Sequence, residues 1–265
     1  GLQSAFEYRL KIMELINKFQ TPFLIGTIDF SKISRNGNDE YQTHNSAILI
    51  DKKVEITAQY HKTHLVPFGE YTPFGNIFPV LEKLIGMGRS LTRGKYFTTF
   101  EIKDGVKAGI NICYEDIFPE ISRRHTLAGA NLLVVLTNDA WYPKSSEPEQ
   151  HLSHAVFRAI ENRRTIIRNG NNSASCVINP YGIITDSLSL KTDMKTGKSV
   201  PSPHTREKGF AIFKVDLDEN PPITFYTKHG NVFITFCLLC VLYGLFKIFL
   251  SWQKEKTLLL QKESR

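Results

Sequence analysis

Short apolar runs alternate with amphipathic stretches along most of the chain. Residues 6–19 carry apolar side chains at helical spacing, and Pro22 separates them from the apolar run 23–29, which is typical of a strand. A second helix is predicted at 148–164, where the apolar positions form one stripe. Further strands are predicted at 43–50, 96–102, 106–112, 132–137, 165–168, 174–178 and 210–215. This alternation predicts a layered α/β sandwich.

Two polar stretches are predicted to be irregular. Residues 31–39 are rich in Asn and Gly and should form the turn between two neighbouring strands. Residues 191–208 have little pattern and contain Pro201 and Pro203, which indicates a loop.

One segment differs from the rest of the chain. Residues 232–250 are apolar except for Lys247, and as a helix they would extend about 28 Å, the thickness of a bilayer's hydrocarbon core. Lys247 lies near the end of this segment, where its ammonium can reach the headgroups. We therefore predict a transmembrane helix at 231–251, with a buried core helix as the alternative.

The charges beside this segment predict its orientation. Positive side chains follow it closely, whereas only Lys228 and His229 precede it. The stretch 252–265 is then a basic cytoplasmic tail, and 1–230 lies on the outer face of the membrane. The positive residues of the tail are Lys254, Lys256, Lys262 and Arg265.

The composition is that of a folded globular protein. The 265 residues are 42% hydrophobic and 22% charged, with a formal net charge of +7. Much of the positive excess falls in the tail and in 191–208, where it can meet anionic headgroups or simply solvent. No basic helix interleaved with aromatic residues is present in the sequence, so nucleic-acid recognition is not indicated.

Cys113 is the strongest candidate for chemistry. It closes the apolar run 106–112 and opens the polar segment 114–120, which predicts a strand-to-helix turn. There the positive end of a helix and nearby backbone N–H groups would favour the thiolate. The alternative is a small buried hydrophobe, because free cysteine is among the most buried residue types.

The other three cysteines have no comparable setting. Cys237 and Cys240 lie within the predicted membrane segment without a partner pair for a metal, and Cys176 lies in a predicted strand.

The segment 60–74, YHKTHLVPFGEYTPF, is the second candidate. A cysteine that attacks a carbonyl needs a base and a cation or N–H donors for the oxyanion, and Glu70 and Lys62 are groups of these kinds. Taken alone, the segment could equally be a surface loop with a solvated lysine. His61 and His64 are spaced for a metal but lack a third ligand, so we predict no metal site.

Four segments, in this order, resemble the nitrilase-type (carbon–nitrogen hydrolase) domain of the bacterial apolipoprotein N-acyltransferase family. They are YHKTHLVPFGEYTPF, GINICYEDIFPE, LTNDAWY followed by PEQHLSHAVFRAIENRR, and RNGNNSASCVINPYGII. HLVPFGE and CYE are specific to that branch. The resemblance covers about residues 21–184, and the apolar C-terminal segment fits it too.

The resemblance implies a nitrilase-like α-β-β-α sandwich with a Glu–Lys–Cys triad. It assigns the lysine to Lys62 and the nucleophile to Cys113, and it places Glu70, Tyr114 and Glu115 at the active site. The family's general-base glutamate comes from a Trp-Pro-Glu type motif upstream of the helix at 6–19, which this sequence does not contain. We therefore expect residues 1–230 to be an N-terminally truncated catalytic domain.

The activity that the resemblance implies is N-acyl transfer without a cofactor or metal. Cys113 would take an acyl chain from a phospholipid as a thioester, and the N-terminal amine of a diacylglyceryl apolipoprotein would accept it. The expected location is the bacterial inner membrane, with the catalytic domain on the periplasmic side. A nitrilase-like amidase that hydrolyses a small amide, and a catalytically dead membrane-anchored binding module, are the alternatives.

Overall fold

The computed structural model of the 265-residue chain describes residues 2–35, 38–75, 80, 90–141, 145–194, 196, 198–202 and 208–263. The chain divides into two compact units, Gly1–Thr227 and Lys228–Arg265. The helices are α1 (Leu2–Phe19), the 3-10 helix η1 (Cys113–Ile117), α3 (Pro119–Leu127), α4 (Glu147–Asn162), α5 (Phe225–His229) and α6 (Val232–Glu263). The strands are β1 (Phe23–Arg35), β2 (Asn38–Ile50), β3 (Ile56–His61), β4 (Thr99–Lys103), β5 (Val106–Ile112), β6 (Leu132–Asn138), β7 (Thr165–Asn171), β8 (Cys176–Ile178), β9 (Ile184–Ser187), β10 (Leu190–Thr192) and β11 (Ser199–Pro201).

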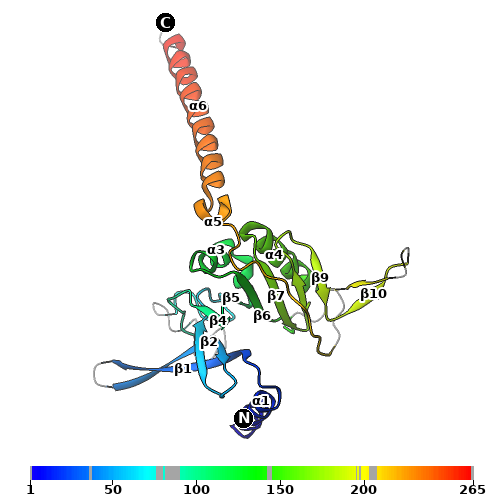
Figure 1. Ribbon diagram of the computed structural model, residues 1–265. Helices are drawn as coiled ribbons and strands as arrows, with labels where there is room; N and C mark the ends of the chain where they lie inside the picture. Colours follow the sequence, from blue (N-terminus) through cyan, green and yellow to red (C-terminus); the bar gives the residue numbers. More distant parts are fainter. Residues whose placement is uncertain are drawn as a thin grey trace. The chain divides into compact units, whose positions relative to one another are not determined.

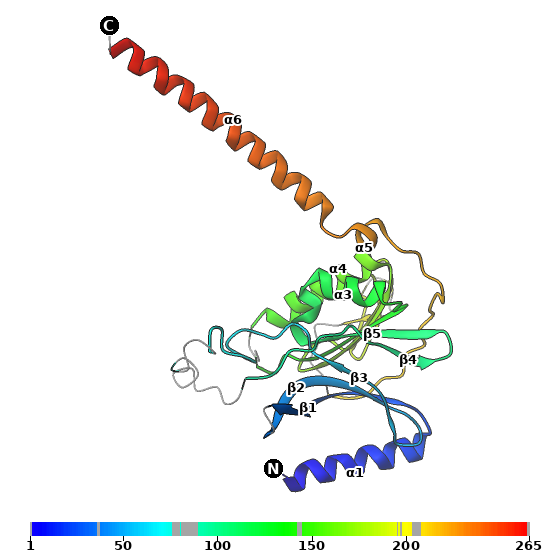
Figure 2. The same cartoon turned by 90° about the vertical axis from the view of Figure 1, so that its left-hand side faces the viewer.

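The first unit is an α-β-β-α sandwich, as expected. A three-stranded antiparallel sheet of order β1-β2-β3 faces a six-stranded sheet of order β4-β5-β6-β7-β8-β9. Figure 2 shows α1 outside the first sheet and α3 and α4 outside the second, and Figure 1 gives the same order of layers. Each sheet therefore has one face against the other sheet and one face against helices.

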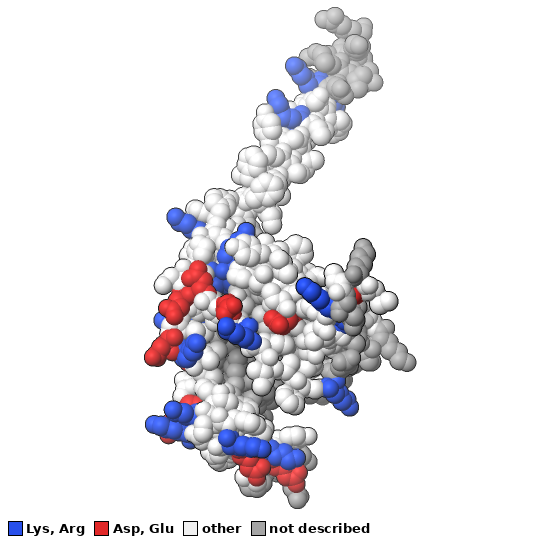
Figure 3. Space-filling model, turned by 45° about the vertical axis from the view of Figure 1, so that its right-hand side comes forward, with Lys and Arg blue, Asp and Glu red and all other residues white. Residues whose placement is uncertain are grey.

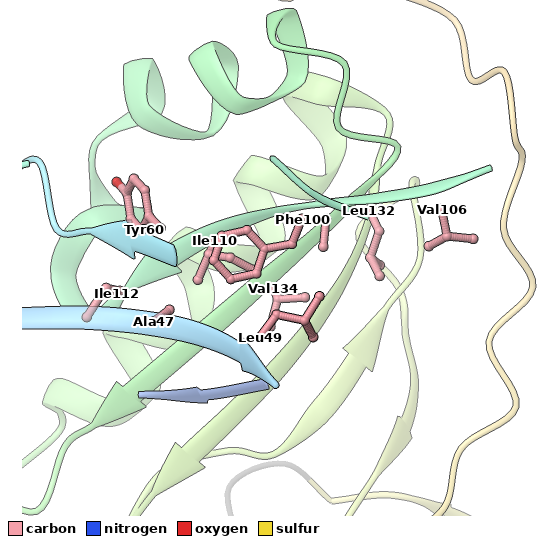
Figure 4. Close-up of a cluster of buried hydrophobic side chains, with 10 residues drawn as sticks. Ala47, Leu49, Tyr60, Phe100, Val106, Ile110, Ile112, Leu132 and Val134 are labelled. Carbon is pink, nitrogen blue, oxygen red and sulfur yellow. The ribbon is translucent and has the colours of Figure 1, made fainter. Parts of the chain in front are cut away.

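The space between the two sheets is filled by apolar side chains (Figure 4). Ala47, Leu49 and Tyr60 come from the small sheet, and Phe100 and Ile110 from the large one; all five are at most 4% exposed. Burial of this kind is the main favourable term in folding. It fixes the register of β2 and β3, because a slip by one residue would turn their buried side chains outward.

Parallel strands at the centre of the large sheet bring three segments to one edge. β5, β6 and β7 run parallel, with Ile112 paired to Leu136 and Leu136 paired to Asn169. Their carboxyl ends therefore meet, and the residues that follow can share one site. Cys113 directly follows the end of β5 at this edge.

The prediction of a strand at 210–215 is wrong. Within the described range 208–218 the backbone forms no strand, and Phe210 and Ile212 are 90% and 92% exposed. The apolar run has the composition of a strand, but among the described residues it pairs with no strand that would supply the hydrogen bonds a sheet requires.

The predicted irregular stretches are also shorter than expected. β10 and β11 pair as a small antiparallel hairpin that, except for Leu190, lies within 191–208. β1 and β2 extend to Arg35 and Asn38, so most of 31–39 is strand rather than turn.

The second unit is dominated by α6. Its stretch Val232–Lys254 is, by length and composition, long and apolar enough to cross a membrane, and none of it is buried within the structure. Figure 3 shows its surface almost without charge until lysines appear toward the far end. Lys247 is the first of these lysines in the sequence.

Candidate active site

Cys113 lies at the turn between β5 and η1, as its position in the sequence predicted. Its backbone is left-handed, with φ +52°, a conformation that L-residues other than glycine seldom adopt. The helix that follows is a single 3-10 helix of five residues. The turn directs the sulfur into a pocket of about 960 Å³.

Burial has the largest effect on the pKa of the Cys113 thiol. It raises the pKa of the thiol, and Asp139 adds to that effect. The Lys62 ammonium, the Thr137 hydroxyl and the Tyr114 backbone N–H favour the thiolate but do not compensate. The turn does favour the thiolate through the Tyr114 N–H, as expected, but the pKa of the thiol is raised overall because burial of the sulfur outweighs the local donors. A nucleophilic Cys113 must lose its proton to a base.

Lys62 follows β3 and is completely buried at the edge of the pocket. Its ammonium donates to both oxygens of Glu70, at 2.9 and 2.8 Å. Glu70 also accepts from Asn45 Nδ2 and the backbone N–H of Val66, each at 2.8 Å. This paired geometry holds a positive charge at a fixed place in the pocket wall.

A short extended segment holds the chain around Lys62. The backbone N–H of Leu91 donates to the carbonyl of Glu70, and that of Gly94 to the carbonyl of Lys62, both at 2.8 Å. A Cβ at Gly94 would lie 2.0 Å from the carbonyl oxygen of His61, so only glycine allows this close approach.

Glu115 lies outside the pocket lining and is completely buried. One carboxylate oxygen accepts from the Tyr60 hydroxyl, from both the backbone N–H and the hydroxyl of Thr63, and from the N–H of His64, at 2.7–3.0 Å. The other accepts from the N–H of Ile112 at 2.9 Å. Glu115 therefore ties the segment that carries Lys62 to the turn that carries Cys113.

Tyr114 lines the pocket beside Cys113. Its backbone N–H reaches the sulfur, and its ring lies 5.0 Å from that of His151. The structure thus brings Cys113, Lys62, Glu70 and Tyr114 to one pocket, with Glu115 behind them.

The pocket is lined by both apolar and polar side chains. Trp141, at its edge, is 80% exposed. The apolar residues in the lining are Ile28, Val66, Leu91, Ile112, Leu136 and Trp141. The polar ones besides those already described are Thr27, Asn45, Thr137, Asn138, Asp139, Asn169 and Asn171.

A group of buried ionised side chains, which sequence reasoning missed, lies next to Cys113. We call Asp116, Asp139, His151 and Arg168 the buried charge cluster; all four are at most 2% exposed. His151 contacts Asp116 at 2.6 Å and Asp139 at 3.2 Å. Arg168 donates to the same two carboxylates at 3.0 and 3.1 Å. The cluster joins η1, the end of β6, α4 and β7.

Protonation within the buried charge cluster follows from these contacts. Burial alone would lower the pKa of His151, but its hydrogen bonds to Asp116 and Asp139 raise it to about 9. Burial would raise the pKa of Asp139, but hydrogen bonds from His151, Ser173 and Thr137 lower it to about 2. These shifts favour the charged forms of both His151 and Asp139, each of which lies against a partner of opposite charge.

The histidines suggest no metal site among the described residues. Donor atoms of Asp139, Glu147 and His151 lie within 4.8 Å of one another. Both ring nitrogens of His151 already face carboxylates, and an imidazolium has no free lone pair for a metal. His61 and His64 are engaged separately, with Ser46 and with the ring of Phe118.

Comparison with known proteins agrees with this architecture. Apolipoprotein N-acyltransferase of Geobacter metallireducens is 31% identical over 236 residues, which cover 89% of this chain and 41% of that protein. Apolipoprotein N-acyltransferase 1 of Treponema pallidum is 37% identical over 193 residues, which cover 70% of this chain and 35% of that protein. The chain thus spans 35% to 41% of the length of these two relatives.

A solved structure supports the fold independently. The carbon-nitrogen hydrolase from Helicobacter pylori G27 matches with a TM-score of 0.52 at 18% identity, over 71% of this chain and 64% of that one. The two-sheet sandwich is that of the nitrilase-like enzymes. Residues 3–197 match the carbon-nitrogen hydrolase family, and the chain belongs to it.

Proposed function

We propose that this chain carries the acyl-transfer site of an apolipoprotein N-acyltransferase. The observation that carries the proposal is one pocket that brings together Cys113, the buried Lys62 ammonium and a set of apolar side chains. Lysine and cysteine together supply an electrophile and a nucleophile, and apolar walls suit acyl chains. The two N-acyltransferase relatives support the same substrate class.

The first half-reaction is acylation of Cys113. The sulfur attacks the ester carbonyl of a phospholipid, an S–C bond forms, and Lys62 stabilises the negative oxygen of the tetrahedral intermediate. The ester C–O bond then breaks, and the lysophospholipid leaves as an alcohol that takes up a proton. Glu70 keeps Lys62 in place, while Glu115 holds the Lys62 segment against the Cys113 turn.

The second half-reaction transfers the acyl group to an amine. The N-terminal amine of a diacylglyceryl apolipoprotein attacks the thioester, an N–C bond forms and the C–S bond breaks. The amine's proton goes to the base or back to the sulfur. The products are an amide and free Cys113.

The proton of the Cys113 thiol requires a base in the first step. Among the described residues that line the pocket, the carboxylates are Glu70 and Asp139, and both already bind cationic side chains. We therefore assign the base to neither of them. Above the pKa of the thiol, hydroxide can do this work, which gives a way to test Cys113 by itself.

We further propose that α6 crosses the bacterial inner membrane, with residues 1–230 on the periplasmic side and 252–265 in the cytoplasm. Both substrates reside in a bilayer, so an anchored site meets them at high effective concentration. The positive residues that follow the apolar stretch support this orientation.

The test is the intact mass of the full chain in phospholipid nanodiscs, at neutral pH and near pH 10. We expect a hydroxylamine-sensitive acyl increment that is largest at high pH, is lost in Cys113→Ala, and is discharged by a diacylglyceryl-cysteine peptide. Hydrolysis of a small soluble amide without any lipid-derived increment would favour the amidase. Neither reaction at either pH would favour a binding module and overturn the proposal.

A further inference from the structure

Thr137 lies between Cys113 and the buried charge cluster. It is the penultimate residue of β6, and its hydroxyl donates to Oδ1 of Asp139 at 2.6 Å. Thr137 also lies beside Cys113, because Ile112 pairs with Leu136 in the parallel ladder and the residues that follow them both line the pocket, so the Cys113 sulfur is a second possible acceptor for this hydroxyl. A hydroxyl has one proton, so it can donate to only one of these two acceptors at a time.

Asp139 does not depend on Thr137 for its charge balance. Its carboxylate also accepts from Nδ1 of His151 at 3.2 Å and from Nη2 of Arg168 at 3.1 Å. If the Thr137 hydroxyl turned toward the sulfur, Asp139 would keep a hydrogen bond from each of two cationic side chains. The cost of turning is therefore small compared with leaving a buried carboxylate unpaired.

The sheet does not need this hydroxyl either. The backbone of Thr137 is paired with Gly170 in the parallel ladder between β6 and β7. The side chain points into the pocket lining rather than into the apolar core. A purely structural role would thus leave the position of this hydroxyl in the pocket lining, next to Cys113, unexplained.

We propose that the Thr137 hydroxyl stabilises the Cys113 thiolate. Asp139, which is also bound by two cationic side chains, accepts the hydrogen bond of this hydroxyl until the sulfur loses its proton. While the sulfur is a thiol, Thr137 donates to Asp139. When the thiol proton has left to the base or to hydroxide, Thr137 keeps its own proton and donates it to the sulfur. The proposal rests on the nucleophilic role of Cys113 in the proposed function.

The charged groups around the sulfur come from several elements. Lys62 faces it from the segment after β3, with Glu70 paired to Lys62, and Asp139 faces it from the end of β6. His151 of α4 and Arg168 of β7 act through Asp139. A change at Thr137 leaves all these charges in place, so its effect on the sulfur is separable from theirs.

The experiment measures the rate of Cys113 alkylation by iodoacetamide in the full chain, read by peptide mass spectrometry across about pH 7 to pH 11. Thr137→Val removes the hydroxyl at nearly constant shape. We expect alkylation near pH 8 to be about tenfold slower and the midpoint of the profile to rise by about one pH unit. Thr137→Ser, which restores the hydroxyl, should react within about twofold of the unchanged protein.

A second variant and a control make the result decisive. Thr137→Ala should slow alkylation as Thr137→Val does, which guards against a packing defect specific to valine. Thr126→Val is the matched control, because the buried Thr126 hydroxyl donates to the Ser122 carbonyl within α3. It should leave the profile unchanged.

Two outcomes would overturn the proposal. One is an unchanged midpoint in both Thr137→Val and Thr137→Ala. The other is an equal loss in Thr137→Ser, which would assign the effect to the methyl group. Alkylation needs no lipid, so a failure of acyl transfer would leave this measurement intact.

Discussion

Two groups of charged side chains flank Cys113, and they are built differently. Lys62 and Glu70 form a single pair at the pocket, and Glu70 is still 15% exposed. The buried charge cluster holds two cations and two anions, all at most 2% exposed. The first arrangement is one ion pair in the wall of the pocket, whereas the second is a network in which each charge faces partners of opposite charge.

This difference indicates that the two groups of charges have different roles. A charge that is needed in a transition state must face the reacting atoms, and it is worth most where water is scarce. Charges that only join elements are expensive to bury unless each is paired. The pair should therefore govern rate, and the buried charge cluster should govern stability.

The largest effect is expected from breaking the buried charge cluster. Arg168→Met removes one of two cations and leaves Asp116 and Asp139 with an uncompensated negative charge. We expect the free energy of unfolding to fall by about 3–5 kcal/mol. Denaturant unfolding measures it. A decrease of less than about 1 kcal/mol would show that water, or a shift of nearby side chains, compensates the charge of these carboxylates.

Breaking the pocket pair should act on rate instead. Lys62→Met keeps the length of the side chain but removes the ammonium that faces the oxyanion. Acylation of Cys113 should slow by about 10²-fold or more, as expected for loss of an oxyanion donor. The mass of the acyl-enzyme over time measures the rate. Lys32→Met, which breaks the exposed pair with Asp39, is the control and should change nothing.

The comparison also predicts a pH effect on stability. His151 has a folded pKa raised to about 9, above its ordinary value, so its contribution is complete below about pH 6.5 and is lost as pH rises through 9. The loss should be at most about 3–4 kcal/mol, because one pKa unit is worth about 1.4 kcal/mol. Unfolding measured against pH should show it. In His151→Gln this alkaline decline should largely disappear; its persistence would assign the decline to other groups.

The smallest effect is expected at a cysteine outside both groups. Cys176 is buried in β8 among apolar side chains, and burial raises the pKa of its thiol to about 11. Cys176→Ala should leave the acylation rate within about twofold and cost about 1 kcal/mol of stability. A large loss of acylation would mean that the pocket geometry depends on packing behind the large sheet.

How far the sequence predicts this site depends on whether the signal is local. The position of Cys113 at a strand-to-helix turn could be predicted because a strand end, a cysteine and a polar turn follow one another within a few residues. The two-sheet fold could be predicted as well, from the strand and helix alternation and the family resemblance. The 210–215 run shows the limit of this prediction. A strand also needs a neighbouring strand to pair with, and the local pattern of apolar residues does not show whether one is present.

The buried charge cluster illustrates the same limit at the site. His151 lies on α4 among polar neighbours that suggest a solvent-facing side, and Arg168 lies in a strand interior. Asp116 is 35 residues from His151 and 52 from Arg168. Each was a single polar residue in its own segment, and only the tertiary fold makes them one group.

The left-handed backbone at Cys113 has a consequence for how such a protein can change. Adopting this conformation costs a residue with a Cβ about 1–2 kcal/mol relative to glycine. Cys113→Gly would relieve this strain, but it would also remove the contacts that Cys113 makes with the core between the sheets. A cysteine at this position therefore occupies a backbone conformation that favours glycine.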